Sequence, residues 1–173
     1  MPDTLDAPQA YRAQVSLLVR VLPLVAEEDV FALKGGTAIN LFVRALPRLP
    51  VDIDLIYLPV ENHATSLANI DAGMRRIAAR IGWSVPCSRT QVVPLHSEGA
   101  ATKVLVACDG VQIKVEMTPV IRGCVLLSRS TGVCDRVEEL FGYAELPVVS
   151  FADLYAGKIV AALDWQHRGR ARP

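Results

Sequence analysis

The apolar residues of the chain recur with two different periods, which separate the expected helices from the expected strands. Apolar residues three and four positions apart fill residues 8–28 and 64–82 and predict two amphipathic helices. Pro23 lies within the first of these segments and is expected to kink or split that helix. A shorter helix is expected from Thr37 to Leu46, and the two prolines that follow would end it.

A last helix is expected from Phe151 to about Trp165. Ser150 stands where an N-cap residue is needed, and Asp153, three positions later, completes a variant of the capping box. The segment therefore carries its own start signal.

Short apolar or alternating runs predict the strands. Val30–Leu33 is an apolar run that ends at two glycines, and Val51–Leu58 alternates well enough for a strand. A further strand is expected over Trp83–Val93, with a break at Pro86. Residues 118–149 are mixed in pattern. Turns are expected there at Pro119, Gly123, Gly132 and Gly142.

The strongest hairpin signal is Asp109-Gly110. The two residues separate the alternating runs 103–108 and 111–117, and Asp-Gly favours the tight turn that joins two antiparallel strands. We therefore expect these two runs to be neighbours in a sheet.

Length and element order define the expected fold class. The chain has 173 residues, of which 51% are hydrophobic, enough for one domain with a core of Val, Leu, Ile and Ala. Helices and strands do not alternate strictly, so we expect an α+β domain with a small, mixed β-sheet and flanking helices. We expect a core over residues 1–149 and a C-terminal helix with a basic tail over residues 150–173.

Charge and cysteine content narrow the possible functions. Lys+Arg and Asp+Glu both total 18, so bulk charge does not indicate a nucleic-acid binder, although the basic residues 166–173 are either a local nucleic-acid patch or a solvated tail. The four cysteines form no Cys-x-x-Cys pair, which disfavours a zinc site. Residues 1–10 are polar with no apolar stretch behind them, and no apolar run would span a membrane, so we expect a cytoplasmic protein without a membrane partner.

Asp52 and Asp54 are the first candidates for chemistry. Side chains alternate along a strand, so an Asp-x-Asp pair places both carboxylates on one face. Their mutual repulsion is relieved by a divalent cation such as Mg²⁺, which prefers oxygen ligands and substrate phosphates. A solvated strand face is the alternative explanation.

Gly35 and Gly36 offer a place for phosphate beside this pair. They stand between an expected strand and an expected helix, where bare backbone N–H groups favour an anion. Thr37 either hydrogen-bonds a phosphate oxygen or caps the helix. Together the glycines and the aspartates indicate a site for a metal ion and a nucleoside triphosphate.

Glu116 is the candidate third acid. On its strand it shares a face with Gln112 and Lys114, away from the apolar face. If this strand lies beside the Asp52/Asp54 strand, three carboxylates converge and are suited to hold two Mg²⁺ ions. Otherwise Glu116 is a surface acid of the hairpin.

Lys158 is the candidate cation. It lies in the last expected helix among apolar neighbours three and four positions away, so its ammonium group needs an anion or must extend to solvent. A triphosphate is one candidate partner, and a nearby acid such as Asp164 is the other.

Four motifs follow one another over about residues 30–167: Leu33-Lys34-Gly35-Gly36-Thr37-Ala38, Val51-Asp52-Ile53-Asp54-Leu55, Ile113-Lys114-Val115-Glu116, and Asp153-Leu154-Tyr155-Ala156-Gly157-Lys158 with Leu163-Asp164-x-Gln166. In this order they resemble the motifs of the AbiEii/AbiGii-type nucleotidyltransferase toxins. The resemblance implies a DNA polymerase β-like nucleotidyltransferase fold and a toxin of a type IV toxin–antitoxin or abortive-infection pair, with a cognate antitoxin as partner. Some members of that family transfer nucleotides from an NTP to the 3′ end of tRNA.

Carried over by position, the resemblance also implies roles for the candidate residues. Gly35, Gly36 and Thr37 would hold the triphosphate, and Lys158 would bind phosphate. The two aspartates would bind metal, with the glutamate as the third acid.

Two departures from the family pattern keep other functions open. Pro50 stands where family sequences often have Ser or Thr, and the chain stops at Pro173, where they continue into an Arg-Asp-x-(Phe/Tyr)-Asp segment and further helices. One alternative is a shortened, catalytically inactive member that only binds an antitoxin or RNA. Another is a nucleotidyltransferase that modifies a protein or a small molecule.

Overall fold

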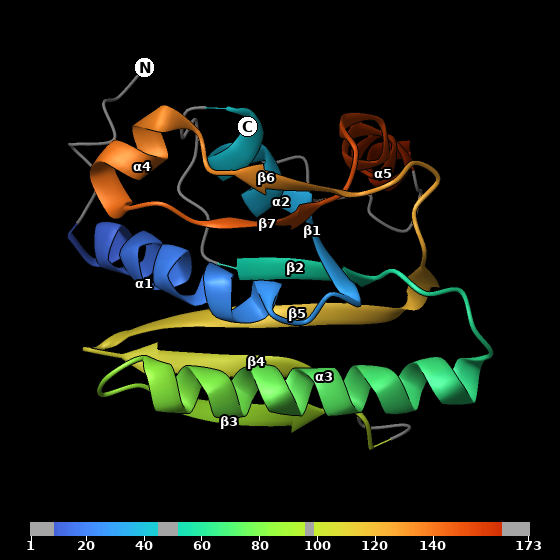
Figure 1. The fold of residues 1–173 in the computed structure, drawn as a ribbon, viewed down its shortest axis with the longest axis horizontal. Coiled ribbons are helices and arrows are strands. Elements are labelled where there is room, and N and C mark those ends of the chain that lie inside the picture. The colour runs from blue at the N-terminus through green and yellow to red at the C-terminus, as the bar shows by residue number, and fades with distance from the viewer. Residues whose placement is uncertain (1–8, 45–51, 96–98, 164–173) are drawn as a thin grey trace.

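Seven strands form one mixed sheet through the centre of the protein (Figure 1). The computed structural model describes residues 9–44, 52–95 and 99–163. The strands follow one another in the order β3-β4-β5-β2-β1-β7-β6, with β2 parallel to β5 and β1 parallel to β7. They are β1 Phe31–Lys34, β2 Asp52–Tyr57, β3 Arg89–Pro94, β4 Ala101–Cys108, β5 Val111–Arg122, β6 Arg129–Gly132 and β7 Glu145–Val148.

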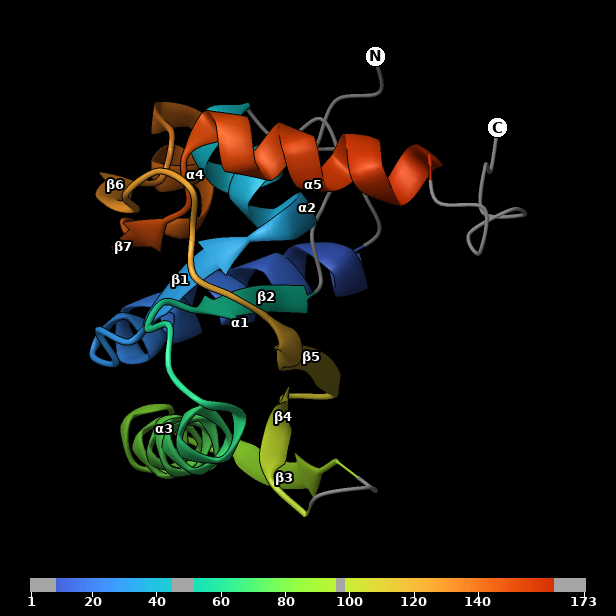
Figure 2. The same ribbon diagram turned by 90° about the vertical axis from the view of Figure 1, so that its right-hand side faces the viewer.

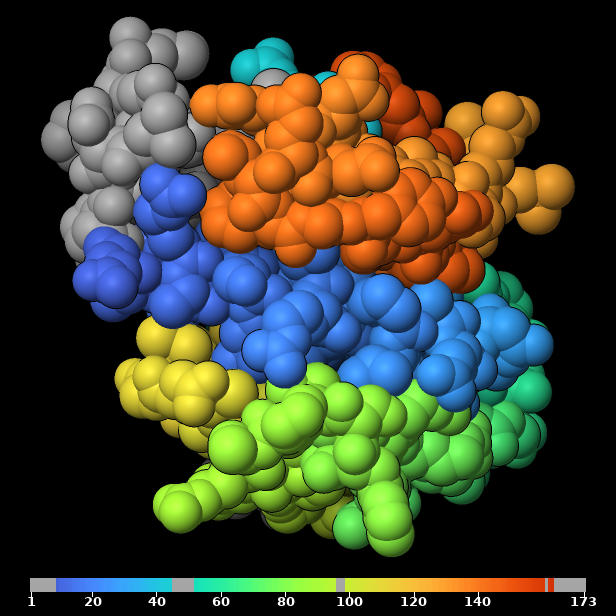
Figure 3. Space-filling model, turned by 60° about the vertical axis from the view of Figure 1, so that its left-hand side comes forward, coloured from blue at the N-terminus to red at the C-terminus, as the bar shows by residue number. Residues whose placement is uncertain are grey.

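Helices lie on both sides of this sheet, which confirms the expected α+β class. α1 and α3 contact one another and β5, while α5 lies alongside α2 on the side of the molecule away from α3 (Figure 2). In Figure 3, α3 (green) packs directly against α1 (blue). The helices are α1 Gln9–Ala26, α2 Gly35–Ala38 with the π-helical turn η2 Ile39–Val43, α3 His63–Ser84, α4 Asp135–Phe141 and α5 Phe151–Leu163.

The two faces of β2 differ sharply in burial. Ile53 and Leu55 are fully buried in the core beneath α1 and α3, whereas Asp52 and Asp54, between them in sequence, are only partly buried. This alternation follows from the period of two along a strand. The core therefore fixes the register of β2 and turns both carboxylates to the other face.

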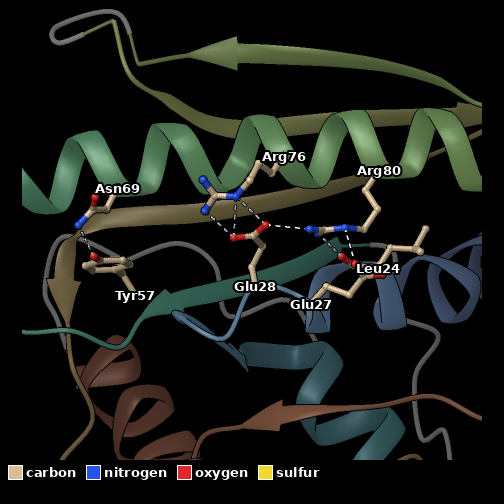
Figure 4. Close-up of polar contacts among 7 residues, drawn as sticks. All are labelled: Leu24, Glu27, Glu28, Tyr57, Asn69, Arg76 and Arg80. Atoms are coloured by element: carbon tan, nitrogen blue, oxygen red, sulfur yellow. Dashed lines mark hydrogen bonds and ion pairs between the residues drawn. The ribbon is translucent and has the colours of Figure 1, made fainter.

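A cluster of charged residues fastens α3 to the end of α1 (Figure 4). The buried Glu28 accepts from Arg76 at 2.7 Å and from Arg80 at 3.0 Å, and Arg80 also pairs with Glu27 at 2.7 Å. Arg80 further donates to the carbonyl of Leu24 at 2.9 Å. The hydrogen bond from Arg76 outweighs the effect of burial and holds the pKa of Glu28 below its ordinary value.

Several expected elements are confirmed with altered ends. The Asp109-Gly110 hairpin is confirmed, and both residues have the positive φ that a type I′ turn requires. α1 continues through Pro23 to Ala26, because Leu22 and Val25 on either side are buried in the core and hold its last turn. The capping of α5 is also confirmed, since the Asp153 N–H donates to the Ser150 hydroxyl at 3.1 Å.

Other expectations were wrong in detail. Trp83 belongs to α3, so β3 begins only at Arg89, and the expected turn at Pro119 lies within β5. The helix expected from Thr37 begins at Gly35 and becomes a π-helical turn that ends at Val43. The later part of that expected helix, and the basic residues 166–173, lie outside the described residues.

The division into a core and a C-terminal appendage stays a prediction. No helix in the described parts of the chain combines the length and the apolarity that crossing a membrane requires.

Candidate functional site

The acidic residues of β2 and β5 meet at the middle of the sheet. In the parallel pairing of these strands, Asp54 is the register partner of Glu116 and Asp52 is the partner of Lys114. Neighbouring strands lie about 4.8 Å apart, so the three carboxylates share one face and one neighbourhood. The condition under which Glu116 would join the two aspartates is therefore met.

Lys114 lies among these acids and neutralises two of them. Its Nζ is 2.6 Å from Glu116 Oε2 and 3.3 Å from Asp52 Oδ2, and Lys103 Nζ is 3.3 Å from Glu116 Oε1. Asp52 and Glu116 thus turn their side chains to the lysines. In the described part of the chain, no three His, Cys, Asp or Glu side chains form a group that could hold a metal ion. Side-chain rotation away from the lysines is needed before the acids can converge on a metal.

The electrostatics of the acids differ. Burial, reinforced by the charge of Asp52, raises the pKa of Asp54 above its ordinary value, even though Lys34 and Lys114 oppose the shift. Burial would also raise the pKa of Glu116, but hydrogen bonds from Lys114 and Lys103 outweigh it and lower that pKa. Within the described residues, Asp52 and Glu116 each form an ion pair with Lys114, whereas Asp54 forms none.

The two glycines that follow β1 have different environments. Gly35 has φ of +77°, and a Cβ placed on it would lie 2.5 Å from Asp54 Oδ2, so no side chain fits there. A Cβ on Gly36 would meet only Asn40 Nδ2, at 4.0 Å. Packing within the chain therefore requires glycine at position 35, whereas position 36 has room for a Cβ in ordinary contact with Asn40.

Thr37 has a role that the sequence did not indicate. Its buried hydroxyl donates to the backbone carbonyl of Asp52, and the N-cap position of α2 is occupied by Lys34 without a side-chain cap. The threonine hydroxyl therefore ties α2 to the start of β2, and its part in binding a nucleotide stays a prediction.

Lys158 lies on α5 with an exposed side chain. Within the described residues it makes no hydrogen bond or ion pair, so nothing fixes its ammonium group near the acids. Asp153, one and a half turns earlier, is tightly held: it accepts from the Ser150 hydroxyl at 2.7 Å and from the N–H groups of Val125 and Leu126 at 3.3 and 3.2 Å.

Lys34 is a residue that sequence reasoning missed. It is the register partner of Asp54 on the antiparallel neighbour β1, and its charge acts on the pKa of Asp54. The signal in the sequence is its position directly before the two glycines, at the end of an apolar strand.

An acidic cluster on a mixed sheet, beside a glycine turn that opens a helix, defines a nucleotidyltransferase-like domain. The family model for the nucleotidyl transferase AbiEii toxin of type IV toxin–antitoxin systems matches residues 16–173. The chain belongs to this family.

Two solved structures resemble the chain. MenT4, a nucleotidyltransferase toxin from Mycobacterium tuberculosis H37Rv, matches with a TM-score of 0.63 and 19% identity over 90% of this chain and 55% of MenT4. ANT(2″)-Ia in complex with adenylyl-2″-tobramycin matches with a TM-score of 0.44 and 15% identity over 88% of this chain and 81% of that protein. The chain thus spans about half the length of MenT4, and that likeness shows the shared fold. No curated protein sequence matches the chain.

Proposed function

We propose that this protein is a metal-dependent nucleotidyltransferase that transfers a nucleoside monophosphate from an NTP to an acceptor hydroxyl. The observation that carries the proposal is the β2–β5 register, which pairs Asp54 with Glu116 and keeps Asp52 on the same face. Membership of the AbiEii family supports the same chemistry.

The residue set fits a divalent metal. Three carboxylates on one face supply the oxygen ligands that Mg²⁺ prefers, and a set of this size suits two ions. Asp52, Asp54 and Glu116 would be the ligands, after Lys114 and Lys103 release the carboxylates they now engage. The bound metal would supply charge neutralisation at the phosphates and lower the pKa of the attacking hydroxyl.

The remaining residues bind and orient the NTP. The N–H groups of Gly35 and Gly36 lie in the first turn of α2, where they lack acceptors within the helix and would donate to a phosphate. Thr37 acts indirectly, by holding the start of β2. Lys158 and Lys34 supply positive charge for the phosphate tail.

In the transfer step, the acceptor oxygen attacks the α-phosphorus of the NTP in line. The new O–P bond forms as the bond to the bridging oxygen breaks. The proton of the acceptor hydroxyl passes to water, and pyrophosphate leaves with the electron pair. Catalysis of this kind depends on positioning and on electrostatic stabilisation.

For the acceptor we propose the 3′ hydroxyl of an RNA such as tRNA, and for the biological role a toxin with a cognate antitoxin. The family description supports the toxin role. The test is incubation with each α-labelled NTP, Mg²⁺, total tRNA and a protein lysate. Label in the RNA fraction is expected. Label in protein or in small molecules would mean that the acceptor is not RNA. Label in no fraction would contradict the proposal.

A second candidate is a catalytically inactive binding module, and Lys114 is the observation that favours it. A lysine that already neutralises Asp52 and Glu116 removes part of the need for a metal. Calorimetry with Mn²⁺ and each NTP separates the two functions. The enzyme should bind the nucleotide only with the metal, whereas the inactive module should bind neither.

A further inference from the structure

A pocket of about 410 Å³ is lined by residues of the sheet, of the segment that follows β5 and of α5. Ile56 contributes to its wall and follows Asp52 and Asp54 on the same face of β2. Successive residues on one face of a strand are about 6.8 Å apart. The pocket therefore begins roughly one sugar unit away from Asp54, and Lys34, the partner of Asp54 across β1, lines its near side.

The walls of the pocket combine apolar surface with positive charge. Lys34 and Arg122 are its cations, and its one carboxylate, Asp153, is already engaged by Ser150 and two backbone N–H groups. Much of the remaining wall is apolar, including Ile56, Val60, Ile121, Val125 and Val149. Such walls suit a flat, largely apolar body that carries an anionic tail.

Gly157 on α5 is the observation that points to a ligand. It lines the pocket, and a Cβ placed on it would meet no atom within 4 Å. A glycine inside a helix costs about 1 kcal/mol relative to alanine, and nothing in the surrounding packing requires it here. The space that it leaves faces the pocket.

We propose that this pocket holds the base and ribose of the NTP, with the nucleoside against the bare backbone of α5 at Gly157 and Lys34 between the nucleoside and the acids. The inference rests on the proposed function and adds a location for the nucleoside. Gly157 is kept small because any side chain would occupy the nucleoside's space.

The test compares binding of Mg–NTP with binding of Mg–tripolyphosphate, which lacks the nucleoside, by calorimetry. Gly157→Ala and Gly157→Leu should raise or preserve the thermal midpoint, because alanine and leucine favour helix. They should weaken NTP binding by about 10- to 200-fold, the range that added methylenes produce in a filled pocket, and leave tripolyphosphate binding unchanged. Ala156→Leu, at the exposed neighbouring position of α5, is the matched control. It should change neither NTP binding nor tripolyphosphate binding.

The outcomes separate the two proposals. If wild-type protein binds NTP and both Gly157 variants bind it equally well, the nucleoside lies elsewhere and this inference is wrong, while the proposed function stands. If NTP binding is unchanged and only the KM for an RNA acceptor rises, the pocket holds the acceptor and the inference is also wrong. If wild-type protein binds neither NTP nor tripolyphosphate with Mg²⁺, the proposed function itself fails.

Discussion

Asp54 places a carboxylate oxygen so close to Gly35 that a Cβ on that glycine would lie 2.5 Å from it. The glycine also has φ of +77°, which side chains rarely tolerate. The glycine turn and the acidic strand are therefore one structural unit, because the turn can pass Asp54 only where the chain has no side chain.

Substitution of the two glycines should separate structure from ligand binding. Gly35→Ala should destabilise the protein by at least about 1–2 kcal/mol through the positive φ and should displace Asp54, so that transfer is lost. Gly36→Ala should keep or slightly raise stability, since it has room and favours helix, yet should weaken NTP binding. Thermal unfolding and calorimetry on the two variants check this. Equal behaviour of both variants would show that Gly36 has no separate role in binding.

Neutralising Asp54 should raise stability while abolishing activity. Burial and the neighbouring Asp52 raise the pKa of Asp54, so its ionised form opposes folding. A raised carboxyl pKa contributes stability below the ordinary pKa and loses it as the pH rises through the folded pKa. Asp54→Asn should therefore match wild type in acid, exceed its thermal midpoint at neutral pH, and transfer label about 100-fold or more slowly.

Asp29→Asn, at an exposed position, is the control for this substitution. It should alter neither the thermal midpoint nor the rate of label transfer. A well-folded Asp54→Asn protein that transfers label at the wild-type rate would remove Asp54 from the site.

Lys114 should compete with metal for the acids. Lys114→Met removes the charge that neutralises Asp52 and Glu116, so the variant should be less stable than wild type without metal. Its affinity for Mn²⁺ should rise, and saturating Mn²⁺ should restore more stability to the variant than to wild type. Titration of the thermal midpoint with Mn²⁺ measures both effects. A midpoint that does not respond to Mn²⁺ in either protein would favour the inactive binding module.

The placement of the acids could be predicted because it depends on local periods. Alternation along β2 and along the Asp109-Gly110 hairpin puts Asp52, Asp54 and Glu116 away from the apolar faces, and only the pairing of β2 with β5 had to be assumed. Other contacts join residues far apart in sequence, so spacing alone does not predict them. Examples are the hydrogen bond from Thr37 to the Asp52 carbonyl, beside the acids, and the ion pair of Glu28 with Arg76 between α1 and α3.

Residues 118–149 resisted prediction for a different reason. β6 and β7 are only four residues long, which is too short to show a period, and each is defined by its neighbour in the sheet. Pro119 is tolerated within β5 although a proline usually marks a turn. In such segments tertiary pairing decides the structure more than local pattern does.

Asp153 should hold the segment around Val125 and Leu126 against α5. Asp153→Ala removes two hydrogen bonds to backbone N–H groups and the bond with Ser150, which should cost about 1–2 kcal/mol at this partly exposed position. Amide exchange at Val125 and Leu126 should accelerate, while exchange in β4 stays unchanged. Asp153→Asn keeps one acceptor oxygen, so its amide exchange rates at Val125 and Leu126 should fall between those of wild type and Asp153→Ala. Unchanged exchange at both amides in the alanine variant would contradict this role.

The Glu28 cluster should make stability depend on pH. Because hydrogen bonds from Arg76 and Arg80 lower the pKa of Glu28, its contribution is present above the ordinary value of 4.5 and is lost as the pH falls through the folded pKa. Glu28→Gln should lower the free energy of unfolding at neutral pH by about 1.5–3 kcal/mol, since it weakens charge-assisted hydrogen bonds with two guanidinium groups, of which that of Arg76 is largely exposed.

The matched control is the adjacent and exposed Glu27→Gln, which breaks one surface pair with Arg80 and should cost no more than about 1 kcal/mol. Urea unfolding of wild type and both variants between neutral and acid pH gives the comparison. The difference between wild type and Glu28→Gln should shrink as the pH falls, because protonated Glu28 resembles glutamine. A difference that stays constant with pH would mean that the charge of Glu28 is not what fastens α3 to α1.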